Sequence, residues 1–120
     1  MSTIDFVQLL ILLQFKHLVV DWILQPPWMW KNKGTYGHIG GLAHSTFNAV
    51  TSGLCFLLVT PNIIPIITID FLVHYHIDWA KMNISRVTNW KPTTHPEFWW
   101  LTGFDQFLHQ ITYILLLLYV

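Results

Sequence analysis

Three short stretches of the chain carry a histidine and an aspartate four residues apart. They read HLVVD at 17–21, HYHID at 74–78 and DQFLH at 105–109, and only the last has the aspartate first. Residues four apart lie on one face of a helix, one turn above each other. Each pair is therefore expected to present an imidazole and a carboxylate to the same side, a donor set that suits metal binding and acid–base catalysis.

Three neutral imidazoles suit zinc, with a fourth position open for water. The aspartates then have two open roles: they orient the histidines, or they bind a second ion together with a further histidine. Zinc is the favoured divalent metal, with iron and manganese as alternatives. A bound metal makes hydroxide available near neutral pH, and Asp21, Asp78 or Asp105 would act as the catalytic base. The predicted metal ligands are His17, Asp21, His44, His74, Asp78, Asp105 and His109.

The composition is that of a membrane protein. Hydrophobic residues make up 53% of the 120 residues and charged residues only 10%, against roughly 25% charged in an average soluble domain. Six basic and six acidic residues give a formal net charge of zero, which excludes nucleic-acid binding through a basic surface. The expected partner is therefore a lipid bilayer.

Four apolar segments organise the chain, at residues 4–25, 40–60, 63–82 and 99–120. Each has the length of about 20 residues that a helix needs to cross roughly 30 Å of hydrocarbon. Helices satisfy their own backbone hydrogen bonds in lipid. We therefore predict an all-α fold, a four-helix transmembrane bundle forming a single integral membrane domain over residues 1–120.

The connections between the segments predict an orientation. The longer connections, Pro26–Ile39 and Asn83–Phe98, hold Lys31, Lys33, Arg86 and Lys91. The opposite side has both termini and the turn TPN at 60–62, without Lys or Arg. Because positive residues favour the cytoplasm, we expect both termini on the non-cytoplasmic side.

This orientation explains the reversed pair. The first and third segments run toward the cytoplasm and the fourth runs away, so reversing the order keeps the aspartates in one layer and the histidines in the next. At 1.5 Å per residue, the aspartate layer lies roughly 6 Å and the histidine layer roughly 12 Å from the cytoplasmic ends of the helices. In the second segment, His44 falls at the aspartate level and Asn48 at the histidine level. Such residues also form interhelical hydrogen bonds, but three pairs of matched depth favour a metal site.

Four other polar residues have weaker signals. Asp70 lies one turn before His74 and is expected to support the site or to handle protons. Lys16 is expected to pair with a carboxylate. Lys81 either holds an anionic group or extends toward the interface. His76 falls on the face opposite His74 and is left out of the metal set.

Two helix starts are also predicted. Ser2 and Asp5 have the spacing of a capping box. Thr94, followed by Pro96 and Glu97, is expected to cap the last helix.

The stretches HLVVDW, QPPWMWKNK, HYHIDWAK and DQFLHQ resemble an uncharacterised family of small multi-span proteins of bacteria and their phages, a domain of unknown function. The resemblance covers about His17 to Gln110 and implies an integral membrane helical fold in the bacterial inner membrane, that of the host cell for a phage protein. It implies no activity. A looser similarity to bacterial inner-membrane metal-dependent hydrolases, which also place His and Asp near span ends, favours a metal.

Three functions follow as hypotheses. The first is an enzyme, a membrane-embedded zinc-type hydrolase acting on a lipid headgroup or a small amphiphile near the cytoplasmic interface. The second is a proton or metal transporter, because rows of His and Asp also serve proton relays. The third is a non-catalytic accessory protein of a phage or bacterial membrane. Four short helices leave little room for a closed pocket, so a homo-oligomer is also expected.

Overall fold

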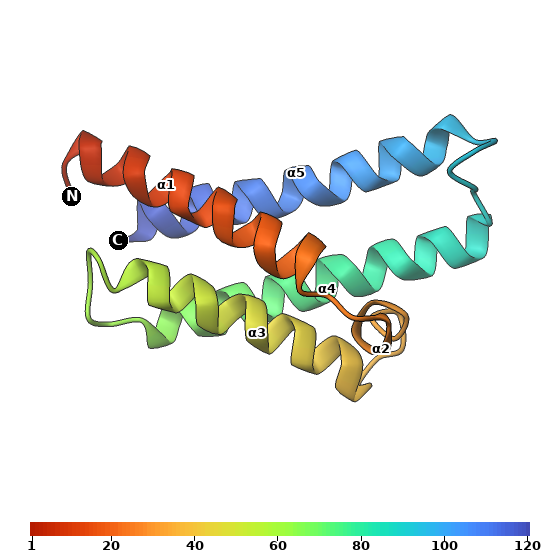
Figure 1. Ribbon diagram of the computed structural model, residues 1–120, viewed down its shortest axis with the longest axis horizontal. Coiled ribbons are helices and arrows are strands. Elements are labelled where there is room, and N and C mark those ends of the chain that lie inside the picture. The colour runs from red at the N-terminus through yellow and green to blue at the C-terminus, as the bar shows by residue number, and fades with distance from the viewer.

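Four long helices run side by side in the computed structural model, which describes all of residues 1–120 (Figure 1). The predicted all-α fold is confirmed. The elements, in chain order, are α1 (Thr3–His17), the π-helical turn η1 (Leu18–Ile23), the short α2 (Pro27–Trp30), α3 (Ile39–Phe56), α4 (Ile64–Thr88) and α5 (Pro96–Tyr119).

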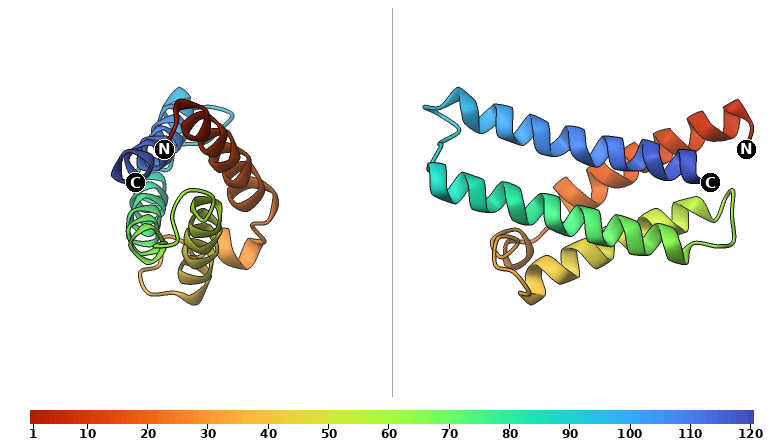
Figure 2. Two further views of the ribbon diagram at one scale, coloured as in Figure 1. Left: turned by 90° about the vertical axis from the view of Figure 1, so that its left-hand side faces the viewer. Right: turned by 180° about the vertical axis from the view of Figure 1, so that it is seen from behind.

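The two ends of the bundle differ. Both termini and the turn between α3 and α4 lie at one end, and α2 and the α4–α5 connection lie at the other (Figures 1 and 2). One helical stretch, Thr3–Ile23, is long and apolar enough by length and composition to cross a membrane. The structure therefore shows the helical bundle, whereas the crossing of a membrane by all four long helices stays a prediction.

Three helix bounds differ from the predicted segments. Helix α4 continues past Met82 to Thr88 and is capped by Asn89 in the left-handed conformation, φ 55°. Helix α3 already ends at Phe56, before the tight turn. Helix α5 starts at Pro96, whose fixed φ suits the first turn of a helix. Hydropathy marks the apolar part of a helix, and backbone caps decide where the helix ends.

One of the two predicted helix starts is confirmed. The Ser2 side chain accepts from the backbone N–H of Asp5, whose carboxylate accepts from the backbone N–H of Ser2. Thr94 as the cap of α5 is wrong, because His95 holds that position without a side-chain cap bond. The Thr94 hydroxyl lies instead 2.9 Å from Nδ1 of the His95 ring.

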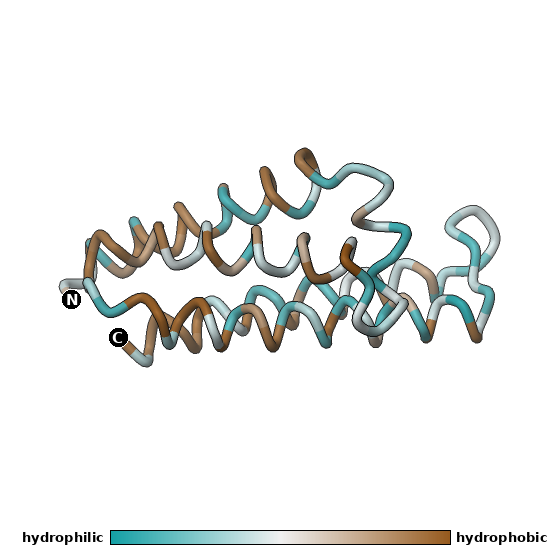
Figure 3. Tube along the Cα trace, turned by 90° about the horizontal axis from the view of Figure 1, so that it is seen from below, coloured by the Kyte–Doolittle hydropathy of each residue, from teal (hydrophilic) through white to brown (hydrophobic).

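The apolar core occupies the end of the bundle near the termini, where the chain is most hydrophobic (Figure 3). Its buried residues come from four helices and are Leu9, Leu13, Phe56, Ile66, Tyr113, Leu116 and Leu117. This packed end closes the bundle on one side. The buried histidines and aspartates lie farther from the termini along the bundle.

Glycines at the start of α3 allow the connection carrying α2 to pack closely. A Cβ at Gly40 would collide with the Trp28 carbonyl oxygen, and one at Gly41 would come within 3.3 Å of Lys33 Cα. The small residues therefore place Lys33 over the interior of the bundle.

Replacing Gly40 with alanine is expected to destabilise the protein by about 1–3 kcal/mol, because the new methyl group must push the α2 backbone away. Thermal unfolding in detergent measures the change. Gly103→Ala is the matched control, since Gly103 lies in α5 with no atom within 4 Å of its added Cβ. Equal unfolding temperatures for the two variants would contradict this account.

Candidate metal centre

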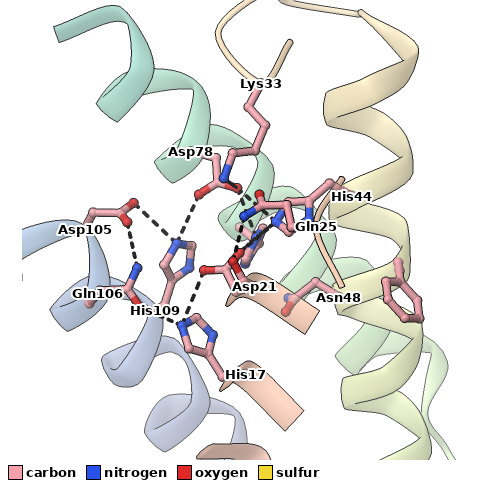
Figure 4. A network of polar contacts seen from close by, with 12 residues as sticks. His17, Asp21, Gln25, Lys33, His44, Asn48, Asp78, Asp105, Gln106 and His109 are labelled. Carbon is pink, nitrogen blue, oxygen red and sulfur yellow. Dashed lines mark hydrogen bonds and ion pairs between the residues drawn. The ribbon is translucent and has the colours of Figure 1, made fainter. Parts of the chain in front are cut away.

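The seven residues predicted to bind metal lie together inside the bundle, and Figure 4 labels all of them except His74. Each is at most 6% exposed. They come from the end of α1, from η1, and from α3, α4 and α5. Burial of so many polar side chains in one place is costly unless they are paired or bind a cation.

All three pairs share a helix face as predicted. The His Nε2 to Asp carboxylate distances are 3.4 Å for His17 and Asp21, 3.1 Å for His74 and Asp78, and 3.4 Å for His109 and Asp105. The reversed order in α5 thus brings its pair to the same place as the other two.

Asp21 lies in the π-helical turn, which the sequence did not predict. The turn closes with a bond from Leu24 N–H to the Val19 carbonyl, 2.7 Å, five residues back. The Gln25 side-chain amide donates to the Asp21 carbonyl at 2.6 Å and holds the turn in place. Single π turns inside helices are frequent at functional sites, and this one places a carboxylate.

The first possible ligand group consists of Asp21, His44, His74 and Asp78, all buried, with ligand atoms within 4.8 Å of one another. His44 Nε2 lies 2.8 Å from Asp21 Oδ1 and 3.0 Å from His74 Nε2. Two imidazole nitrogens and two carboxylate oxygens converge from three elements, η1, α3 and α4. This is a donor set for zinc, iron or manganese.

The second possible ligand group consists of Asp78, Asp105 and His109, also buried and within the same spacing. Asp78 belongs to both groups. Its Oδ1 lies 3.2 Å from His109 Nε2, and its Oδ2 lies 3.1 Å from His74 Nε2. One carboxylate therefore faces both groups, with a different oxygen toward each.

Two buried carboxylate oxygens of this centre, Asp78 Oδ2 and Asp105 Oδ1, make no hydrogen bond. Asp78 Oδ2 has only the ion-pair contacts with Lys33 and the imidazoles, and Asp105 Oδ1 has only the contact with His109 at 3.4 Å. Buried polar atoms are nearly always satisfied in native proteins. Anionic oxygens that make no hydrogen bond and lie beside four imidazole rings are what a cation would complete, so the residues present fit a metal.

His17 lies beside the two groups and belongs to neither. Its Nδ1 is 2.8 Å from the Tyr113 hydroxyl, and its Nε2 is 2.7 Å from Gln106 Oε1. The Gln106 amide in turn donates to Asp105 Oδ2 at 2.9 Å. His17 is thus connected to Asp105 through Gln106, and ligation of a metal by His17 stays a prediction.

Lys33 is a site residue that the sequence reasoning missed. It is 9% exposed, and its Nζ lies 3.2 Å from Asp78 Oδ2. In the sequence, Lys33 stands out only as a basic residue in a connection between helices, directly before Gly34. That signal predicts a cytoplasmic side and gives no indication of a contact with Asp78, the carboxylate that the two groups share.

A second buried polar group lies around Asn48. Lys16 Nζ donates to Asn48 Oδ1 at 2.6 Å and lies 4.0 Å from Asp70 Oδ2. The Asn48 amide donates to Asp70 at 3.0 Å. Lys16 therefore faces a carboxylate, as predicted. His76 is exposed and binds the Tyr36 hydroxyl at 2.9 Å, outside both ligand groups.

Comparison with known proteins gives a family without an assigned activity. No curated protein and no solved structure is significantly similar to the chain. One protein family, described as "Protein of unknown function (DUF3307)", matches residues 9–120. The match takes in all seven residues of the centre and all the helices apart from the first turns of α1. The chain therefore belongs to the DUF3307 family.

Proposed function

We propose that this protein is a membrane-embedded, metal-dependent hydrolase whose centre holds two divalent cations bridged by Asp78. The observation that carries the proposal is the place of Asp78 in both ligand groups, with one oxygen facing each. Two-ion hydrolytic centres have metals roughly 3.5–4 Å apart, a separation that one carboxylate spans. Zinc is the favoured ion, and iron and manganese are the alternatives.

The chemistry would be addition of water to an ester. Divalent cations held by the two ligand groups would make hydroxide available near neutral pH and would stabilise negative charge on the ester oxygens. The water oxygen bonds to the phosphorus or acyl carbon, and the bond to the leaving oxygen breaks. Asp21 is the proposed base, because it lines a polar cavity open to the outside. The proton it accepts passes on to the leaving oxygen.

The surface of α1 supports a place in the membrane. Leu9 and Leu13 are buried in the core, yet Ile4, Ile11 and Phe15 on other faces are 63–69% exposed. A helix that exposes large apolar side chains beyond its core-facing side is stabilised by an apolar surrounding on its outer face. Lipid supplies it, and the bacterial inner membrane is the proposed location.

Metal analysis of the purified protein tests the proposal. We expect about two equivalents of a transition metal in detergent-solubilised material never exposed to chelator. Chelation should abolish hydrolysis of an ester probe, and zinc, iron or manganese should restore it. A content below about a tenth of an equivalent would overturn the proposal.

A proton conduit is the second candidate, favoured by the buried polar contacts that continue from His17 through Tyr113 and Lys16 to Asp70. Against it, the packed apolar core closes the bundle beyond Asp70. Proton flux into liposomes separates the two functions. Flux abolished by His74→Ala would favour a conduit, and a proton-tight protein that hydrolyses the ester would favour the enzyme.

A further inference from the structure

Two cavities each reach one carboxylate of the candidate metal centre, and they differ in chemistry. The first is a groove of about 290 Å³ between α4 and α5. Its apolar walls are Ile77, Ala80, Ile84, Leu101, Phe104 and Leu108. Ile84 and Phe104 are 45% and 58% exposed, so the groove opens on the outer surface of the bundle. Asp105, a residue of the second ligand group, also lines it.

The second cavity, of about 320 Å³, is polar and lies near η1 and the connection after α2. Asp21, Gln25 and Lys33 line it, with Trp22 and Trp30 also in its wall. The ammonium group of Lys33 is the one that lies 3.2 Å from the bridging carboxylate. This cavity therefore places positive charge directly beside the centre.

Lys81 lines both cavities. It follows Asp78 by three residues in α4, so it lies almost one turn beyond the bridging carboxylate on the same side of the helix. Each cavity also reaches one carboxylate of the centre, Asp105 from the groove and Asp21 from the polar side. A ligand that fills both would pass Lys81 and lie next to both ligand groups.

We propose that the substrate is an anionic amphiphile, a phosphoester with a long apolar chain. The chain would lie in the α4–α5 groove and the phosphate between Lys81 and Lys33. This inference rests on the proposed hydrolase and adds its substrate class. Lys33 is already paired with Asp78, but a neutral ester would leave Lys81 without a role, and a small soluble phosphate ester would leave the apolar groove without one. Entry of this substrate from the lipid phase also agrees with the opening of the groove on the outer surface of the bundle.

Binding of two phosphonates, which contain no hydrolysable ester, tests the proposal directly. The metal-loaded protein in phosphatidylcholine nanodiscs is titrated with dodecylphosphonate and with methylphosphonate, and empty discs give the reference for partitioning. We expect dodecylphosphonate to bind at least about tenfold more tightly, because only its chain fills the groove. Equal affinities for the two would overturn the proposal.

Substitutions in the groove and at the lysine separate the two halves of the ligand. Ile84→Trp should weaken dodecylphosphonate about tenfold and leave methylphosphonate unchanged. Leu72→Trp is the matched control, because Leu72 is 49% exposed on the same helix and lines neither cavity. Lys81→Met should weaken both phosphonates about tenfold, since it removes a charge-assisted contact to the phosphonate oxygens.

The outcomes also distinguish this inference from the proposed function. Metal content is measured on every variant, and Ile84→Trp and Lys81→Met should keep the wild-type content. A protein that holds metal and hydrolyses a short soluble ester, but binds dodecylphosphonate no better than methylphosphonate, refutes the substrate class alone. Equal binding of dodecanol and dodecylphosphonate would refute the role of the lysines. A protein without metal refutes the hydrolase itself.

Discussion

Replacing Asp78 with asparagine is expected to remove both metal ions and to abolish hydrolysis, with a rate loss of at least about a thousandfold. The carboxamide keeps the shape of the side chain, but it offers one neutral oxygen in place of two anionic ones. Both ligand groups contain Asp78, so both lose a ligand at once. Elemental analysis of the purified variant should find less than about a tenth of an equivalent of metal.

The variant also leaves Lys33 buried without its carboxylate partner, which is destabilising in itself. Adding Lys33→Met removes that charge, so the double variant should fold and should still lack metal. Arg86→Gln is the control on the same helix, because Arg86 is exposed, belongs to neither ligand group and lines neither cavity. Two ions retained by folded Asp78→Asn protein would exclude the bridge, and one retained ion would assign Asp78 to a single group.

The architecture could be predicted from the sequence because length, apolar composition and proline positions all favour four long helices. The termini and the short turn could be placed at one end, since four consecutive segments predicted to span a membrane must alternate in direction. The π-helical turn could not be predicted. The letters LVVDWI have no feature that marks it, and it is held by the contact of Gln25 with the Asp21 carbonyl.

The candidate centre could be located largely from spacing. A separation of four residues fixes a common helix face, and the reversed order in DQFLH fits a helix running in the opposite direction. Counting residues from the cytoplasmic ends of the helices placed His44 at the level of the aspartates. In the structure, His44 lies 2.8 Å from Asp21 and 3.4 Å from Asp78. These relations depend only on helix geometry, which is why they transfer from sequence to structure.

The direction of individual side chains could not be predicted in the same way. The ring of His17 is held by Tyr113 and Gln106, which are 96 and 89 residues away in the chain. Lys33 reaches Asp78 only because Gly40 and Gly41 let its connection pack against α3. Such contacts depend on tertiary packing across the bundle, for which residue spacing within one helix gives no information.

The division of the centre into two groups leads to a second large effect, expected for Asp105→Asn. Asp105 belongs to the second group alone, so the variant should keep about one equivalent of metal in the first group and lose the other. Hydrolysis should still fall by about a hundredfold or more, because one ion cannot stabilise both the attacking and the leaving oxygen.

Elemental analysis and initial rates, measured on the same preparation of Asp105→Asn protein, give the two quantities independently. Glu97→Gln is the matched control, a carboxylate changed to a carboxamide in the first turn of the same helix, outside both groups. Adding His44→Ala to Asp105→Asn should then remove the remaining ion, because His44 belongs to the first group. If Asp105→Asn alone lost both ions, the groups would not bind independently. If it lost neither ion, Asp105 would not be a ligand, and its unpaired Oδ1 would need another explanation.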